Sequence, residues 1–124
     1  MKNRLLRTPL FFLVFITLFF TVILSVSAAD GYVKSGDFTY YVSGSYATVT
    51  AYNGTSASVT IPSKAGSYTV VGVADKAFWS KKEIKSVTLP STIQSIGKAA
   101  FNECTGLTKL VLPSNLKIIS ESAF

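Results

Sequence analysis

The chain offers few side chains that could catalyse a reaction or bind a metal ion. Histidine, the usual general base near neutral pH and a frequent zinc ligand, does not occur among the 124 residues. The six acidic residues are dispersed, without the close pairs of glycosidases or the spacing of calcium-binding loops. We therefore predict that the protein is not an enzyme and that it holds no cofactor and no metal ion.

Aromatic side chains are the remaining candidates for binding, because tyrosine and tryptophan combine a large contact area with a polar tip. In the 23-residue repeat described below, Trp79 occupies the position that Asn102 has in the next copy. We therefore expect the Trp79 side chain to be exposed and to be a candidate aromatic contact. Several tyrosines are further candidates for a ligand-binding patch: Tyr40, Tyr41, Tyr46, Tyr52 and Tyr68. Alternation along a strand predicts that half of these tyrosines fill the core instead.

The first 29 residues have the order of a secretory signal peptide. Three basic residues precede an apolar run from Leu10 to Leu24, and a stretch of small residues ends at Ala29. Cleavage is expected before Asp30 or one residue earlier. An uncleaved membrane anchor is the alternative, although the apolar run is shorter than the roughly 20 residues that span a bilayer. We predict a secreted or cell-surface protein that touches a membrane only through this segment, if it is retained.

The charge of the chain beyond this leader argues against a nucleic-acid partner. Nine lysines and six acidic residues remain, which gives a net charge of +3, and no arginine is left. The lysines are scattered between Lys34 and Lys117, whereas nucleic-acid-binding surfaces usually cluster basic residues among aromatic ones. We therefore expect no nucleic acid to bind.

A 23-residue repeat organises the second half of the chain. Three Ala-Phe pairs end at Phe78, Phe101 and Phe124, each 23 residues after the one before. Apolar residues recur with the same step elsewhere, as in Val87 and Leu110. This period lies in the range of leucine-rich repeats, whose single units are too small to bury their apolar side and therefore stack on one another.

The repeat predicts which residues face outward. The segments 84–89 and 107–112 have the L-x-x-L-x-L spacing of leucine-rich repeats, and alternation turns Val87, Leu89, Leu110 and Leu112 into the core. The strands are expected to form a parallel sheet, and residues 97–104 a short helical turn on the far side. The predicted contact residues on the concave face are Ser58, Thr60, Ser86, Thr88, Lys109 and Val111.

Cys104 is the only cysteine, so the chain cannot form an internal disulfide and must fold by burial alone. The thiol has no histidine partner and occupies a repeat position that faces the core. These two features favour a buried, inert thiol over a nucleophile.

The segment before the repeats predicts a β-hairpin that caps the stack. Residues 38–42 and 46–52 are rich in aromatic and β-branched side chains, and a Ser-Gly-Ser turn joins them. Residues 58–61 are expected to form a third strand. The predicted plan is a signal peptide at 1–29, a linker at 30–36, the cap at 37–62, and leucine-rich repeats at 63–124 with the last repeat truncated.

One motif set resembles a known family. The pattern Ile-x-x-Ile-Gly, Ala-Phe, Cys-x-x-Leu and Leu-x-Leu-Pro is similar to the bacterial surface-antigen type of leucine-rich repeat, called BspA-like. The residues that carry the pattern are Ile93, Ile96, Gly97, Ala100, Phe101, Cys104, Leu107, Leu110, Leu112 and Pro113. The resemblance covers about residues 38–124 and implies a secreted or surface-displayed solenoid used in adhesion or host interaction.

Together these features predict an α/β solenoid, in which a short leucine-rich-repeat stack with a parallel sheet follows a hairpin cap. The expected function is binding of an extracellular protein or glycan. One alternative is the N-terminal fragment of a longer solenoid with only a structural role, whose uncapped last repeat would allow end-to-end self-association. A remote alternative is a secreted hydrolase, which only the extracellular address supports.

Overall fold

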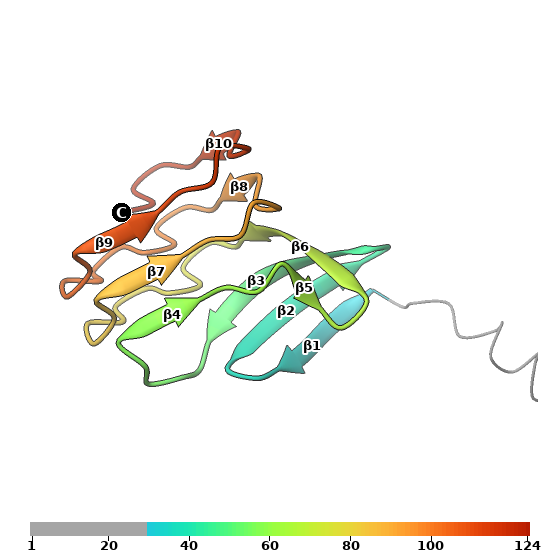
Figure 1. The fold of residues 1–124 in the computed structure, drawn as a ribbon, viewed down its shortest axis with the longest axis horizontal. Helices are drawn as coiled ribbons and strands as arrows, with labels where there is room; N and C mark the ends of the chain where they lie inside the picture. The colour runs from blue at the N-terminus through green and yellow to red at the C-terminus, as the bar shows by residue number, and fades with distance from the viewer. Residues whose placement is uncertain (1–29) are drawn as a thin grey trace, which may run out of the picture.

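The computed structural model describes residues 30–124, so the predicted signal peptide lies outside the described part of the chain. This part forms ten strands in stacked coils (Figure 1). The strands are β1 Gly31–Ser35, β2 Phe38–Ser43, β3 Tyr46–Tyr52, β4 Ser58–Thr60, β5 Lys64–Ala65, β6 Tyr68–Val73, β7 Ser86–Thr88, β8 Ser95–Ile96, β9 Lys109–Val111 and β10 Ile118–Ile119.

The predicted parallel solenoid is confirmed, and its coils run between two sheets. The chain alternates between a three-stranded parallel sheet, β4-β7-β9, and a second sheet in which β3, β6, β8 and β10 are also parallel. Val59, Val87 and Leu110 are partners in the first sheet and pack into or against the core. The sequence predicted that β7 and β9 are neighbours in a parallel sheet, but it placed β4 in the cap. It did not predict the second sheet, whose later strands are only two residues long.

The expected helical turn at residues 97–104 is wrong, and the described residues contain no helix. Successive tight turns connect the two sheets instead. Ala99 and Glu103 have positive φ angles of 53° and 59°, which a right-handed helix does not allow. The backbone also bonds to the neighbouring coil, since the Phe101 amide donates to the Ala123 carbonyl over 2.7 Å. Hydrogen bonds between coils thus replace those within a helix.

A column of stacked aromatic rings runs through the core and confirms that the Ala-Phe pairs occupy equivalent places. The rings of Phe78 and Phe101 are 4.8 Å apart and 17° from parallel. Phe101 and Phe124 follow at 5.7 Å and 7°. Tyr52 stacks on Phe78 at 5.5 Å and supplies the ring of the first coil. The sequence repeat did not reveal this role, because Tyr52 precedes Phe78 by 26 residues and not 23.

Each coil buries the coil before it. Phe101 is 2% exposed, whereas its counterpart in the last described coil, Phe124, is 51% exposed. The predicted core residue Leu112 is likewise 44% exposed, while Leu89 in the coil before is buried. A core side chain in this fold is therefore shielded from solvent mainly by the coil that follows it, rather than by the other residues of its own coil.

The cap differs from the predicted hairpin at both ends. The segment 30–36, predicted to be a linker, forms β1, which pairs with β2 through a tight turn at Gly36. The cap therefore has three antiparallel strands, β1-β2-β3. Strand β4 was placed in the cap but pairs with β7 in the first sheet. Strand β3 joins the two parts, because it is antiparallel to β2 and parallel to β6.

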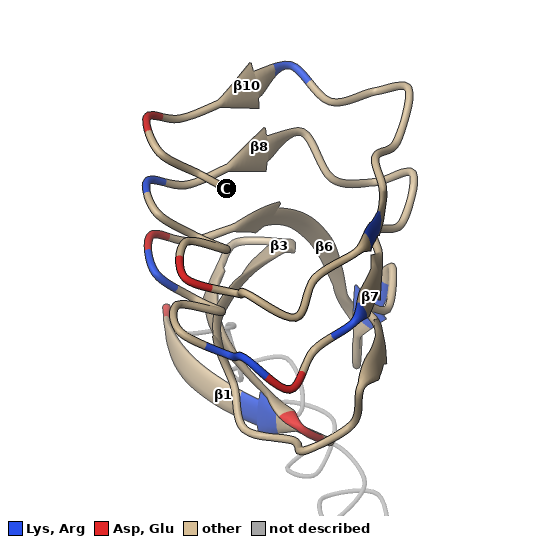
Figure 2. Ribbon diagram, turned by 90° about the vertical axis from the view of Figure 1, so that its left-hand side faces the viewer, with Lys and Arg blue, Asp and Glu red and all other residues tan. Residues whose placement is uncertain are grey.

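One edge of the stack carries charged side chains at equivalent repeat positions (Figure 2). The Asp75 carboxylate accepts a 2.7 Å hydrogen bond from the Lys98 amide, and the Lys98 ammonium lies 3.0 Å from the Glu121 carboxylate. The ion pair is exposed, so solvent screens most of its energy. The approach of the coils requires Gly97, since a β-carbon there would lie 2.5 Å from the Asp75 amide nitrogen.

We predict that Phe101→Ala lowers the free energy of unfolding by about 3–5 kcal/mol, because it leaves a cavity inside the ring column. Urea unfolding followed by circular dichroism measures the change. The matched control, Phe124→Ala, removes a half-exposed ring and should cost clearly less. Equal losses for the two variants would contradict burial by the following coil.

We also predict that Gly97→Ala destabilises the fold by more than about 1 kcal/mol, because the new methyl group meets the backbone of the preceding coil. Gly31→Ala is the control, since a β-carbon at Gly31 meets nothing within 4 Å. Thermal unfolding of both variants provides the comparison. If Gly97→Ala melts at the wild-type temperature, the close approach at this position is not required.

Candidate functional site

The six predicted contact residues come together on the outer face of the β4-β7-β9 sheet, which lies toward the viewer in Figure 1. The register places Ser58 beside Ser86 and Ser86 beside Lys109. A second row contains Thr60, Thr88 and Val111. The intervening residue of each strand points inward, so the two rows share one face. We call this surface, made of these six side chains, the sheet face.

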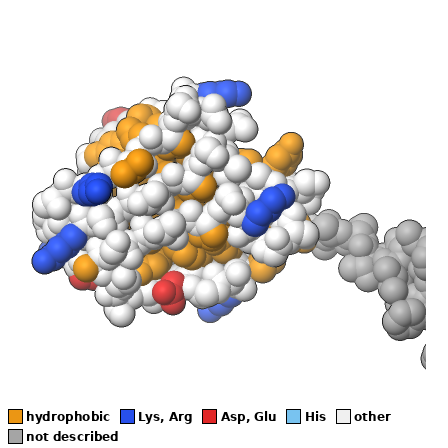
Figure 3. Space-filling model, in the orientation of Figure 1, with side chains coloured by type: hydrophobic (Ala, Val, Ile, Leu, Met, Phe, Trp, Pro, Cys, Tyr) orange, Lys and Arg blue, Asp and Glu red, His pale blue; other side chains and the backbone are white. Residues whose placement is uncertain are grey.

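The sheet face presents small uncharged groups with one cation. The Ser86 hydroxyl donates to the Ser58 hydroxyl over 2.9 Å, which links two strands. Five of the six side chains are exposed, and Ser86 is half-buried. Figure 3 shows charged side chains mainly toward the margins of the molecule on this side. Such a surface suits close contact through hydrogen bonds and apolar groups rather than attraction by a strong field.

Trp79 is exposed, as expected, with 49% of its surface accessible. It lies in the turns between β6 and β7, where its amide donates to the Lys76 carbonyl over 3.0 Å. The structure therefore places Trp79 in a connecting turn and not among the strand residues of the sheet face.

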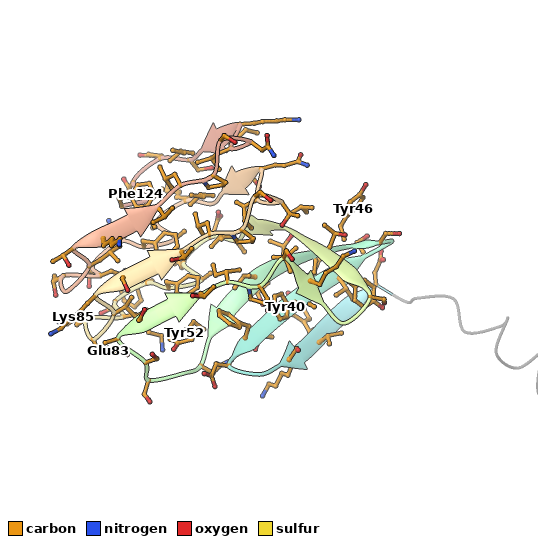
Figure 4. All side chains as sticks on the ribbon, viewed as in Figure 1. Tyr40, Tyr46, Tyr52, Glu83, Lys85 and Phe124 are labelled. Carbon is orange, nitrogen blue, oxygen red and sulfur yellow. The ribbon has the colours of Figure 1, made fainter. Side chains whose placement is uncertain are left out.

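The tyrosines divide between core and surface, as alternation predicted. Tyr40 and Tyr52 are buried inside the cap, while Tyr46 points away from the strands with 58% of its surface exposed (Figure 4). Tyr41 is also exposed, and its ring lies 5.4 Å from that of Tyr32. The Tyr40 hydroxyl has no hydrogen-bond partner among the described residues, and burial raises the pKa of Tyr40 above its ordinary value.

The sequence did not predict a groove that opens beside Tyr46. Its volume is about 580 Å³. It is lined by Tyr46, Thr69, Val71, Ser91, Thr92, Gln94, Ser114, Asn115, Leu116 and Lys117. Most of these residues repeat with the 23-residue step, as in Val71, Gln94 and Lys117. The 23-residue spacing could have predicted the groove from the sequence. The residues at the repeated positions differ in type, however, so the sequence comparison did not reveal them.

Cys104 is buried, as predicted. Its thiol donates a hydrogen bond to the Phe78 carbonyl over 3.0 Å and thereby joins two coils. Burial raises the pKa of the thiol above its ordinary value, so the reactive thiolate is disfavoured. Within residues 30–124, no three residues of the types His, Cys, Asp and Glu gather as a metal site would require, and no helix could cross a membrane.

Comparison with known proteins identifies the family. The model of the BspA-type leucine-rich repeat region matches residues 71–124. A leucine-rich repeat protein of Bacteroides capillosus is 33% identical, with a TM-score of 0.71 over 75% of this chain and 73% of that protein. The chain belongs to the BspA-type leucine-rich repeat family.

Other similar leucine-rich repeat structures are longer than this chain. A leucine-rich repeat protein of T. pallidum is 33% identical, with a TM-score of 0.67, and the match covers 72% of this chain and 42% of that protein. A leucine-rich cell surface protein of Faecalibacterium prausnitzii is 28% identical, with a TM-score of 0.63, and the shares are 76% and 28%. None of the curated proteins matches the chain.

We predict that a thiol reagent at about pH 8 leaves Cys104 unmodified in the folded protein and labels it fully in guanidinium, because the buried thiol resists ionisation. Mass spectrometry measures the labelling. The Cys104→Ser variant should remain unlabelled in both conditions and so controls for other sites. Rapid labelling of the native protein would contradict a closed core at this position.

Proposed function

We propose that this BspA-type repeat protein is an exported or surface-displayed binding module and that the sheet face contacts an extracellular protein or glycan. The observation that carries the proposal is the alignment of six outward side chains in two rows across three parallel strands. Pairing among the three strands and the buried Val59 and Val87 behind two of them hold these side chains in place, which lowers the ordering entropy lost on binding.

The surroundings of the sheet face support binding rather than catalysis. The sequence contains no histidine, and its one thiol is buried and hydrogen-bonded to a carbonyl. The groups that remain on the face are hydroxyls, one ammonium and one isopropyl side chain. These groups can donate, accept and pack, but hydroxyls without a neighbouring base are weak nucleophiles.

The surface location rests on two kinds of support. The leader has the composition of a secretory signal, and one similar structure belongs to a cell surface protein of Faecalibacterium prausnitzii. Adhesion or host interaction is the role that such an address would serve. A membrane contact would involve only the N-terminal segment, if that segment is retained.

We predict that Thr88→Arg combined with Val111→Arg weakens binding at the sheet face by at least about tenfold, because two large cations would hold a partner away from the strands. Wild-type protein is first applied to a glycan array and to a panel of purified extracellular proteins. Surface plasmon resonance then measures the affinity of both proteins for whichever probe binds.

The matched control is Ser35→Arg, which adds the same side chain at an exposed position on the edge strand β1. It should bind as the wild type does, and all three proteins should share one circular dichroism spectrum. Unchanged affinity of the double variant would remove the sheet face from consideration. Absence of any binding partner in both panels would count against the binding function itself.

A further inference from the structure

The groove beside Tyr46 is a second surface with the features of a built site, and it is separate from the sheet face. Its walls come from equivalent positions of successive coils, namely Thr69, Thr92 and Asn115 in one series. Neighbouring strands of a sheet lie about 4.8 Å apart, so side chains at equivalent positions follow one another at that interval along the groove. A ligand that contacts several coils would therefore need to be extended.

Polar groups in the groove are available to a ligand. The side chains of Ser91, Gln94 and Ser114 make no hydrogen bond with another described residue, while the Asn115 amide donates to the Ser91 carbonyl over 3.1 Å. The Thr92 hydroxyl lies beneath this surface, shielded from solvent and without a partner in residues 30–124, so it is not exposed to a ligand. The side chains that are exposed supply donors and acceptors that match a ligand rich in hydroxyl groups; they are Ser91, Gln94, Ser114 and Asn115.

An aromatic ring stands at one end of the groove. Tyr46 and its neighbours Val71 and Gln94 line an adjoining hollow of about 320 Å³. The exposed ring offers an apolar face with a polar edge, and Val71 extends the apolar part. The C–H face of a sugar ring would pack against such a surface while its hydroxyls reach the Gln94 amide.

The charge of the groove points to an anionic ligand. Lys117 is part of the lining, and the Lys64 ammonium donates to the lining hydroxyl of Thr69 over 2.9 Å. Since Thr69 pairs with Tyr46 across the sheet, one cation lies near the aromatic end. None of the ten lining residues is acidic. Lysines beside a groove whose lining contains no acidic residue favour ligands that bear carboxylates or sulfates.

We infer that this groove binds an anionic oligosaccharide. Tyr46 packs against one sugar ring, the Gln94 and Asn115 amides with the serine hydroxyls contact sugar hydroxyls, and Lys117 pairs with an acidic group further along. The inference concerns a surface that the proposed contact at the sheet face does not use. Either idea can therefore fail while the other stands.

Isothermal titration calorimetry of the full chain tests the inference with two probes, an oligogalacturonate hexamer carrying carboxylates and a heparin hexasaccharide carrying sulfates. We expect at least one probe to bind saturably. The difference between the two affinities shows whether the groove prefers carboxylates or sulfates. Tyr46→Ala and Lys117→Gln should each weaken that binding by about tenfold or more. Uncharged cellohexaose should bind more weakly than the anionic probe, and added salt should weaken the anionic probe's binding.

Two controls separate the groove from the rest of the surface. Tyr32→Ala removes a tyrosine that is 74% exposed and lies outside the groove, and it should leave the affinity unchanged. The double variant Thr88→Gln with Val111→Gln, which alters the sheet face without adding charge, should also bind the probe as the wild type does. Amide chemical shifts of Gln94 and Asn115 in the wild-type protein should move on titration, which tests the groove without any substitution.

Three results would overturn the inference. The first is that neither probe binds saturably. The second is that Tyr46→Ala binds as well as the wild type while the amide chemical shifts of Gln94 and Asn115 do not change on titration. In the third result, a poly-glutamate peptide binds as tightly as the sugars, which would make the groove a general anion or acidic-peptide site.

Discussion

Contact between successive coils is the interaction on which the rest of this structure depends. No single coil contains enough residues to enclose an apolar interior, so the ring of each coil is covered by the ring of the next. Ring stacking and the hydrogen bonds between coils act along the same axis, as the bond from the Phe101 amide to the Ala123 carbonyl shows. The 23-residue period follows, because equal coils keep both sets of contacts in register.

The constraint explains how much of the fold the sequence could predict. Residues that touch the neighbouring coil are restricted in type, and the Ala-Phe pairs and the L-x-x-L-x-L segments therefore recur visibly. They predicted the stack, the parallel pairing of β7 with β9, the outward residues on these strands and the buried Cys104, all of which the structure contains. Strand alternation also predicted correctly that only part of the tyrosines would be exposed, because the cap has one buried face, although it did not predict which ones.

The errors fall where local pattern competes with contacts between coils. Residues 97–104 contain alanine and phenylalanine and suggested a helical turn, but positive φ angles at Ala99 and Glu103 turn the chain so that its amides reach the next coil. The segment 30–36 was predicted to be a linker, but its residues 31–35 pair with β2 and form the edge strand of the cap. The groove beside Tyr46 depends on side chains from four segments, and only the folded coils bring them together.

The same constraint divides the surface into parts with different freedom to change. A side chain that points inward must fit the coils above and below it, whereas an outward side chain at the same repeat step meets only solvent and its two neighbours across the sheet. The series Val71, Gln94 and Lys117 shows this freedom, since three unlike residues occupy one position on the same backbone. The stack thus supplies straight rows at a fixed spacing, and the outward residues give each row its chemistry. Recognition by this protein is therefore expected to reside in rows that cross several coils, because no single coil presents enough groups to hold a ligand.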